Sequence, residues 1–305
     1  MIYLLLLLVA YGLAVTEVAV SAVNSETTLN GFGSIIPTRR KQTYAPMRYR
    51  VLIPWLLGWI ENEEVRWAAY KWLRIAGSWL SLVLMQRLSL ALTGDWWLSI
   101  VGAMALALTI AAGLLYDYGE YPWELAGVLG LYSCAVFAVY WPIPLILFAW
   151  ALLRETAVFG VLISLSMLIG VSDPAGIWWT AGLLGWMAGY WLVHRIQGNT
   201  KHYHLVQFGK INTLSINGSR VRSEFKRWRS GCISGYPLAF LMLGYIGYVG
   251  LAALHTMSTP LVLRWLLPTV PILGAMLYFG IWAEVRIFLP VMAPAIVVNL
   301  MVAAR

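Results

Sequence analysis

The sequence is short of charged residues and of cysteines, and each shortage excludes a class of protein. Charged residues make up 11% of the 305 residues, whereas hydrophobic residues make up 61%. A soluble globular domain has about 25% charged and about 45–50% apolar residues, so this chain cannot cover a water-exposed surface of its size. The two cysteines exclude a disulfide framework. The composition therefore predicts a polytopic membrane protein.

The excess of basic residues indicates which partners to expect. The formal net charge is +8, and in a membrane protein such an excess typically faces the anionic headgroups of lipids. We therefore expect membrane lipids, and not nucleic acid, as partners. The histidine pair His202 and His204 has no acidic or cysteine companion nearby, so the sequence predicts no metal site. We also expect no cofactor.

Long apolar runs predict where the chain crosses the bilayer, because a spanning helix needs about 20 apolar residues. The runs cover residues 2–22, 67–86, 96–116, 122–140, 145–171, 176–193, 237–254, 264–283 and 286–303. The segment 51–60 is too short to span, and we expect an interfacial helix there. The sequence thus predicts an all-α protein with a single transmembrane domain over residues 1–305 and about nine spanning helices. Turn signals separate several runs: Thr93-Gly94-Asp95, Trp141-Pro142-Ile143-Pro144 and Ser172-Asp173-Pro174.

Two long polar segments decide the predicted orientation. Residues 194–234 are rich in Lys and Arg and contain a single acid, Glu224, which is typical of a cytoplasmic loop. The N-terminus is then cytoplasmic as well, and the loop over residues 23–66 faces outward with 116–122 and 172–175. The first loop is also basic, which favours the opposite orientation, but its excess is smaller. We expect the protein in a bacterial plasma membrane.

A few ionisable residues fall within apolar runs, where each costs about 2.5–3.5 kcal/mol on insertion scales. Arg154 and Glu155 lie near the middle of one run, and Glu284 and Arg286 interrupt the last apolar stretch. Adjacent helical positions point about 100° apart, so each side chain is expected to find its partner on another helix. One interpretation is a buried ion network that fixes helix register. The other is a polar cavity that holds an anionic headgroup or a proton path.

Other basic side chains lie near the predicted helix ends. Lys71, Arg74 and Arg87 are close enough to an end that we expect them to snorkel to the membrane surface.

An acidic and aromatic segment, Tyr-Asp-Tyr-Gly-Glu-Tyr-Pro-Trp-Glu, covers residues 116–124 at a predicted outer helix end. Aromatic rings stack on the apolar faces of sugars, and a carboxylate can accept a hydroxyl proton, so Asp117 and Glu120 are candidate general bases. The alternative is an ordinary aromatic belt at the membrane interface.

Two arginines precede the short segment of the first loop. The planar guanidinium groups of Arg48 and Arg50 match a phosphate, so a lipid phosphate or diphosphate is a natural ligand. Plain anchoring to lipid headgroups is the alternative.

These motifs, in this order, resemble those of bacterial polytopic proteins similar to GT-C-type glycosyltransferases. The matching residues are Arg-Tyr-Arg-Val-Leu-Ile-Pro at 48–54, Arg-Glu-Thr at 154–156 and Glu-Val-Arg-Ile-Phe-Leu-Pro at 284–290. Enzymes of this kind transfer a sugar from a polyprenyl-phosphate donor to an acceptor at the outer face of the membrane. In this chain Asp117 or Glu120 would supply the catalytic base in place of the family's acid in the first outer loop, and Arg48, Arg50 and Arg286 would hold the lipid phosphate. Arg154 and Glu155 are the further candidate substrate-binding residues.

The chain also departs from that family. The family's acid in the first outer loop would be Glu17 or Glu26 here, and neither belongs to an Asp-x-Asp pair. A second hypothesis is therefore a non-enzymatic accessory subunit of a larger membrane complex. It would pack through small-residue and Trp-rich helices, with the loop 194–234 used for docking or lipid contact. A transporter is least favoured, since no two equivalent halves are seen.

Overall fold

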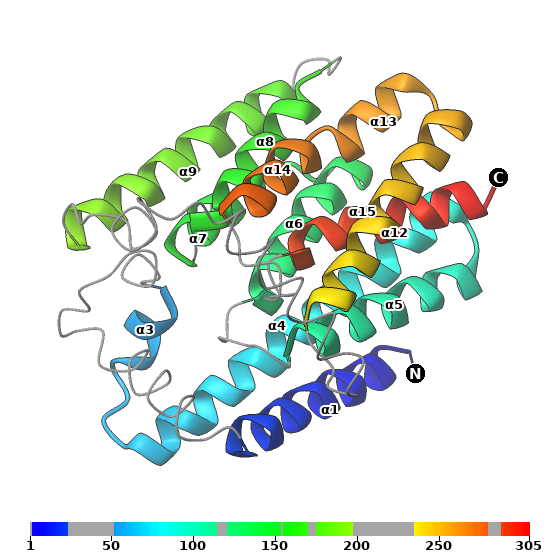
Figure 1. The fold of residues 1–305 in the computed structure, drawn as a ribbon. Helices are drawn as coiled ribbons and strands as arrows, with labels where there is room; N and C mark the ends of the chain where they lie inside the picture. Colours follow the sequence, from blue (N-terminus) through cyan, green and yellow to red (C-terminus); the bar gives the residue numbers. More distant parts are fainter. Residues whose placement is uncertain are drawn as a thin grey trace.

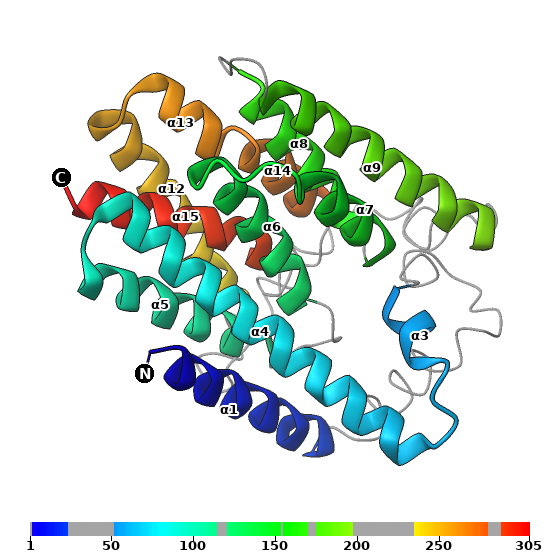
Figure 2. The ribbon, with the colours of Figure 1, turned by 180° about the vertical axis from the view of Figure 1, so that it is seen from behind.

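The computed structural model describes residues 2–23, 52–114, 121–153, 155–169, 175–197, 235–279 and 288–305. Within these ranges the secondary structure is α-helix with one 3-10 turn and no strand, which confirms the predicted all-α class. The elements are α1 (Ile2–Val23), α3 (Leu52–Leu57), α4 (Glu63–Thr93), α5 (Trp96–Leu114), α6 (Tyr121–Val136), α7 (Ile143–Leu153), η3 (Glu155–Ala157), α8 (Val158–Met167), α9 (Ala175–Gln197), α12 (Gly235–Thr256), α13 (Thr259–Leu266), α14 (Thr269–Phe279) and α15 (Leu289–Ala303). Figures 1 and 2 show them as one bundle.

The turn predicted at Thr93-Gly94-Asp95 joins α4 to α5. Gly94 ends α4 with φ at 69°, a conformation that glycine adopts without strain. The Asp95 carboxylate accepts hydrogen bonds from the backbone N–H groups of Trp97 and Leu98, at 2.7 and 3.0 Å, and so begins α5. A single turn thus both stops one helix and starts the next. The predicted turn at Trp141–Pro144 is confirmed between α6 and α7, and the one at 172–174 lies outside the described residues.

The last helix, α15, lies in the centre of the bundle. It packs against α4, α5, α6, α12, α13 and α14, and nearly all of its side chains are buried. Its sequence has no charged residue and no polar stripe, as expected for a helix surrounded on all sides. Gly102 of α5 allows the close approach, because a Cβ there would lie 2.6 Å from the Leu300 side chain.

The predicted single helix over 145–171 is wrong, because the chain folds back on itself at 154–157. In one continuous helix Gly160 would lie about 15–20 Å from Trp150 and Leu147. Instead, a Cβ at Gly160 would lie 3.0 Å from the Trp150 ring and also meet Leu147. α7 and α8, of 11 and 10 residues, therefore form a hairpin. Each arm is about 15 Å long, half of the roughly 30 Å hydrocarbon core of a bilayer.

The position of the break follows the charge pattern. The hairpin turns between the end of α7 at Leu153 and the start of α8 at Val158, and this is where charged residues interrupt an otherwise apolar run of the sequence. A turn at this point puts them at the end of two short helices, whereas a straight helix would carry them at its middle, where charge is expensive in an apolar medium.

Contacts between neighbours fix the direction of each helix. Tyr3 lies under Arg87 and Tyr11 lies under Lys71, so α1 and α4 are antiparallel. The start of α6 lies at the middle of α4, where a Cβ at Gly77 would meet the Trp123 ring at 3.0 Å.

The second half of the bundle is oriented in the same way. Gly182 of α9 faces Ile143, and Gly189 faces Ala151, so α7 and α9 run parallel. The side chain of Arg305, after α15, donates to the carbonyl of Thr256 at the end of α12. α12 and α15 therefore end together.

These directions bring many helix ends to one side of the bundle. α1, α7 and α9 end there and α4 and α8 begin there (left in Figure 1), and α5 ends and α6, α12 and α15 begin on the same side but nearer the middle of the view. The chain has 21 Lys and Arg and 13 Asp and Glu. Of the described residues, Glu61, Glu64, Arg66, Lys71, Arg74 and Arg195 belong to the parts of α4 and α9 on this side, or precede α4, whereas Arg87, Asp95, Arg264 and Arg305 do not. We call this side the charged end.

This arrangement bears on the predicted topology. The loops 23–66 and 194–234 were expected on opposite faces, but the end of α1 and the end of α9 lie at the same, charged end. The hairpin is the reason, since it replaces one expected crossing by a return to the same side.

Two helical stretches among the described residues are long and apolar enough to cross a membrane, by length and composition. They are Glu64–Thr93 and Leu238–Thr256. Other apolar helices in the same ranges have 10–17 residues. The predicted spans at 264–283 and 286–303 correspond to the helix pair α13 and α14 and to the central α15.

Candidate functional site at the charged end

A small apolar cluster at the charged end brings together elements that border three sequence motifs. Its buried members are Ile53 and Leu57 from α3, Tyr70 from α4 and Leu153 from α7, and Trp123 from α6 packs against them. Each of these elements borders a motif found in the sequence. α3 follows Arg48 and Arg50, Leu153 precedes Arg154-Glu155, and Trp123 follows Asp117 and Glu120.

Most of the predicted site residues themselves lie outside the described residues. These are Arg48, Arg50, Asp117, Glu120, Arg154 and Arg286, and also Glu284. Glu155 begins the 3-10 turn η3 at the tip of the α7–α8 hairpin. The structure therefore describes the positions that flank these residues and, through the cluster above, the proximity of three of the flanking elements.

Arg74 of α4 is a member of this region that the sequence analysis interpreted differently. It was expected to snorkel to the surface, but it is only 4% exposed. Its Nη1 donates to the Tyr70 hydroxyl at 3.3 Å, and the guanidinium lies 5.7 Å from the Tyr70 ring centre. Tyr70 itself belongs to the apolar cluster. Arg74 is thus a buried cation in contact with the cluster.

Glu124 supplies a buried carboxylate on the neighbouring helix. It is fully buried in the first turn of α6, where the positive end of the helix dipole favours a negative charge. α4 and α6 are held together here by the Ser81 hydroxyl, which donates to the carbonyl of Pro122 at 2.7 Å. The contact of Trp123 with Gly77 adds to this. Two buried ionisable side chains, the carboxyl group of Glu124 and the guanidinium group of Arg74, therefore lie on two closely packed helices.

Sequence reasoning found Glu124 as a member of the acidic segment but missed Arg74. The only signal for Arg74 is Tyr70 one turn earlier, since residues four apart share a helix face. Thr156, in η3, is a further polar group at the hairpin tip. Its hydroxyl is buried and has no hydrogen-bond partner among the described residues.

The described residues contain no group of three or more His, Cys, Asp or Glu side chains that could hold a metal ion. The described part of the site contains a buried carboxyl group, a buried arginine and aromatic rings. An arginine can bind an anion, and a carboxyl group can transfer a proton.

Comparison with known proteins adds no relative. No family model matches the chain, and no curated protein or solved structure matches it.

Proposed function

We propose that this chain is an integral membrane protein, on the basis of which side chains face outward. Large apolar residues are exposed on several helices, for example Leu108 at 72% and Leu241 at 70%. The interior, in contrast, contains small polar side chains: Ser78, Ser81, Ser89, Ser99, Ser133 and Ser164. Water would penalise the exposed apolar surface, whereas lipid does not, and small polar residues are typical of contacts between membrane helices.

Helix lengths agree with this placement. The stretches Glu64–Thr93 of α4 and Leu238–Thr256 of α12 are long and apolar enough to span, since a span needs about 20 residues. The α7–α8 hairpin is compatible with a bilayer because α6 and α9 pack around it, and non-helical backbone at membrane depth is tolerated where protein covers it.

Within the membrane, the function that we propose is that of a GT-C-like glycosyltransferase. It would move a sugar from a lipid-phosphate donor to an acceptor at the outer face. The observation that supports it is the apolar cluster in which α3, the end of α7 and the start of α6 meet, because each of these elements borders in the sequence a segment that carries arginines or carboxylates of the motifs. An active site assembled from distant segments requires such a convergence.

The residues have distinct roles in this proposal. Asp117 or Glu120 accepts the proton of the acceptor hydroxyl as its oxygen bonds to the sugar's anomeric carbon. The bond from that carbon to the donor phosphate breaks, and the electron pair leaves with the lipid phosphate. Arg48, Arg50 and Arg286 stabilise the departing phosphate. Arg154 and Glu155 orient the substrate from the hairpin tip.

The charged end faces outward in this proposal, and the N-terminus is cytoplasmic. Basic residues on the outer face run against the usual preference of Lys and Arg for the cytoplasmic side. The anionic donor gives a reason for them, because each phosphate at the site requires positive charge.

The test is to express Asp117→Asn and Glu120→Gln variants in a strain that lacks the gene and to measure surface glycans. Loss of the base is expected to lower transfer by about a hundredfold or more. Asp95→Asn is the matched control, since it also neutralises an acid but lies at the opposite end and keeps an N-cap acceptor. Normal glycans in both test variants would overturn the proposal.

An accessory subunit remains the second candidate, favoured by the outer face of α9. Met187, Tyr190 and Trp191 are exposed there, and aromatic residues and Met are enriched at protein interfaces. Extraction in a mild detergent distinguishes the two. Co-purification of a stoichiometric partner, together with normal glycans in the carboxylate variants, would favour the subunit.

A further inference from the structure

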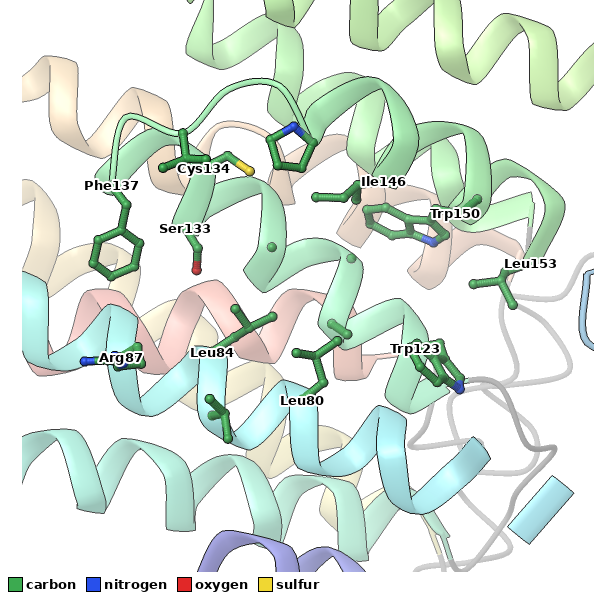
Figure 3. Close-up of a pocket in the computed structure, with 17 residues that line it drawn as sticks. Leu80, Leu84, Arg87, Trp123, Ser133, Cys134, Phe137, Ile146, Trp150 and Leu153 are labelled. Carbon is green, nitrogen blue, oxygen red and sulfur yellow. The ribbon is translucent and has the colours of Figure 1, made fainter. Parts of the chain in front are cut away.

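A second feature lies between α4, α6 and α7, where the helices leave a cavity of about 760 Å³. Its wall is almost entirely apolar, with Leu80, Leu84, Phe137, Ile146 and Leu153 among the lining residues. Figure 3 shows Trp123, Trp150 and Leu153 at one end, and Arg87, Ser133 and Phe137 at the other. The volume is within the range of about 300–1,000 Å³ that is typical of sites for small ligands.

The cavity is elongated along α6. Trp123 and Ser133 both line it, and their ten-residue separation on one helix corresponds to about 15 Å. A long, narrow apolar space fits a hydrocarbon chain better than it fits a compact ligand.

A polar group at the headgroup end of the wall lacks a partner. The Ser133 hydroxyl is buried and forms no hydrogen bond with any described residue. Serine in a helix usually donates to the carbonyl one turn earlier, as Ser164 does here. A buried donor without an acceptor is costly, so a bound molecule with oxygen atoms would relieve the cost.

Arg87 places a positive charge at the Ser133 end of the cavity. Arg87 is exposed, lines the cavity and lies 5.7 Å from the ring centre of Tyr3. Among the described residues no carboxylate forms an ion pair with it. An arginine at the mouth of an apolar cavity is complementary to an amphiphile with an anionic head.

We propose that this cavity binds one acyl chain of an anionic membrane lipid, whose phosphate lies at Arg87 and Ser133. The chain runs along α6 toward Trp123. The headgroup then lies at the opposite end from the apolar cluster and the motifs proposed for the sugar donor. The site therefore takes a membrane lipid that is not the donor.

The inference rests on the membrane placement proposed above and is independent of the transferase reaction. The test uses the full chain purified in a mild detergent, with lipid binding counted by native mass spectrometry. The two probes are dioleoylphosphatidylglycerol, which is anionic, and dioleoylphosphatidylcholine, which is zwitterionic. We expect one tightly held anionic lipid per chain and a preference for it over the zwitterionic lipid.

Three variants locate the binding. Arg87→Gln should weaken retention of the anionic lipid by about tenfold, the scale of one charge-assisted hydrogen bond. Ala149→Phe adds a ring to the cavity wall and should reduce retention of both lipids. Arg195→Gln is the matched control, because Arg195 also lies over an aromatic ring, that of Trp191, on a helix that does not line the cavity. It should leave retention unchanged.

Equal retention of the two lipids, or an Ala149→Phe variant that binds as the wild type does, would overturn the inference. So would an unchanged lipid preference in Arg87→Gln, or a loss in Arg195→Gln as large as that in Arg87→Gln. A thermal unfolding curve for each variant identifies any that fails to fold, and Ala149→Leu then replaces Ala149→Phe. None of these results depends on glycan transfer. If the protein were absent from the membrane fraction of cells, the proposed membrane placement itself would be overturned, so the two failures can be distinguished.

Discussion

The ring of Tyr132 stacks on the ring of Trp265, with centroids 4.3 Å apart and planes 6° apart. The Tyr132 hydroxyl also donates to the backbone carbonyl of Trp265 at 3.1 Å. The pair joins α6, which lines the cavity, to α13, which comes more than 100 residues later in the chain. Tyr132 is fully buried, so both interactions are shielded from solvent. This pair holds together two parts of the bundle that no turn connects.

Substitution of Tyr132 is predicted to separate its two interactions. Tyr132→Phe keeps the stacked ring and loses only the hydrogen bond, so it should lower stability by about 0.5–1.5 kcal/mol. Tyr132→Ala also removes the ring and should cost about 3–5 kcal/mol. Thermal unfolding in detergent measures both, and equal midpoints for the two variants would show that the stacking contributes nothing.

Gly185 is predicted to be essential for the packing of α9 on α7. A Cβ there would lie 2.5 Å from the carbonyl oxygen of Pro144, a backbone atom that cannot move by itself. Gly185→Ala should therefore push the two helices apart and lower the unfolding temperature. Gly244→Ala is the matched control, because nothing lies within 4 Å of its Cβ. It should be neutral or stabilising by up to about 1 kcal/mol, since alanine favours helix.

The α4–α5 turn is predicted to be sensitive at two adjacent positions for different reasons. Gly94→Ala forces a side chain into a left-handed conformation, with φ at 69°, and should cost about 1–2 kcal/mol. Asp95→Ala removes the N-cap acceptor for Trp97 and Leu98 and should cost about 0.5–2 kcal/mol. Asp95→Asn should retain most of the stability. If Asp95→Asn is as unstable as Asp95→Ala, the cap is not the cause.

Cysteine labelling tests the shared face of the charged end. The native Cys232 lies in the segment between α9 and α12, and Glu64 is exposed at the start of α4. We expect a membrane-impermeant maleimide applied to intact cells to label Cys232. In a Cys232→Ser background it should also label Glu64→Cys.

Ser258→Cys, in the same background, is the control at the opposite end. Ser258 is exposed and makes no side-chain cap hydrogen bond, so its substitution should not disturb α13. It should react only after the membrane is made permeable. Labelling of Cys232 and Glu64→Cys from different faces would contradict the shared end. Labelling of Ser258→Cys alone would contradict the outward orientation.

Signals in the sequence were sufficient to predict a helix or a turn wherever neighbouring residues alone determine it. The run at 2–22 forms α1, and Gly94 and Asp95 stop and start helices as their residue types predict. The run at 145–171 was misleading, because its apolar character predicts a helix but does not specify whether the chain continues or returns. Glycines decide the return, since Gly160 permits contact with Trp150. No periodicity in the sequence reports that contact.

The sequence alone determined the all-α class, because its long apolar runs, bounded by turn signals, predict helices and the described residues form them. Only the tertiary structure decided where the charged residues lie. The hairpin and the helix directions bring the start of α4 and the end of α9, with Arg66, Lys71 and Arg195, to one side, and Arg74 and Glu124 are buried on adjacent helices. The physical reason is that composition and periodicity are local quantities. The side of a bundle that a segment reaches depends on every crossing that precedes it.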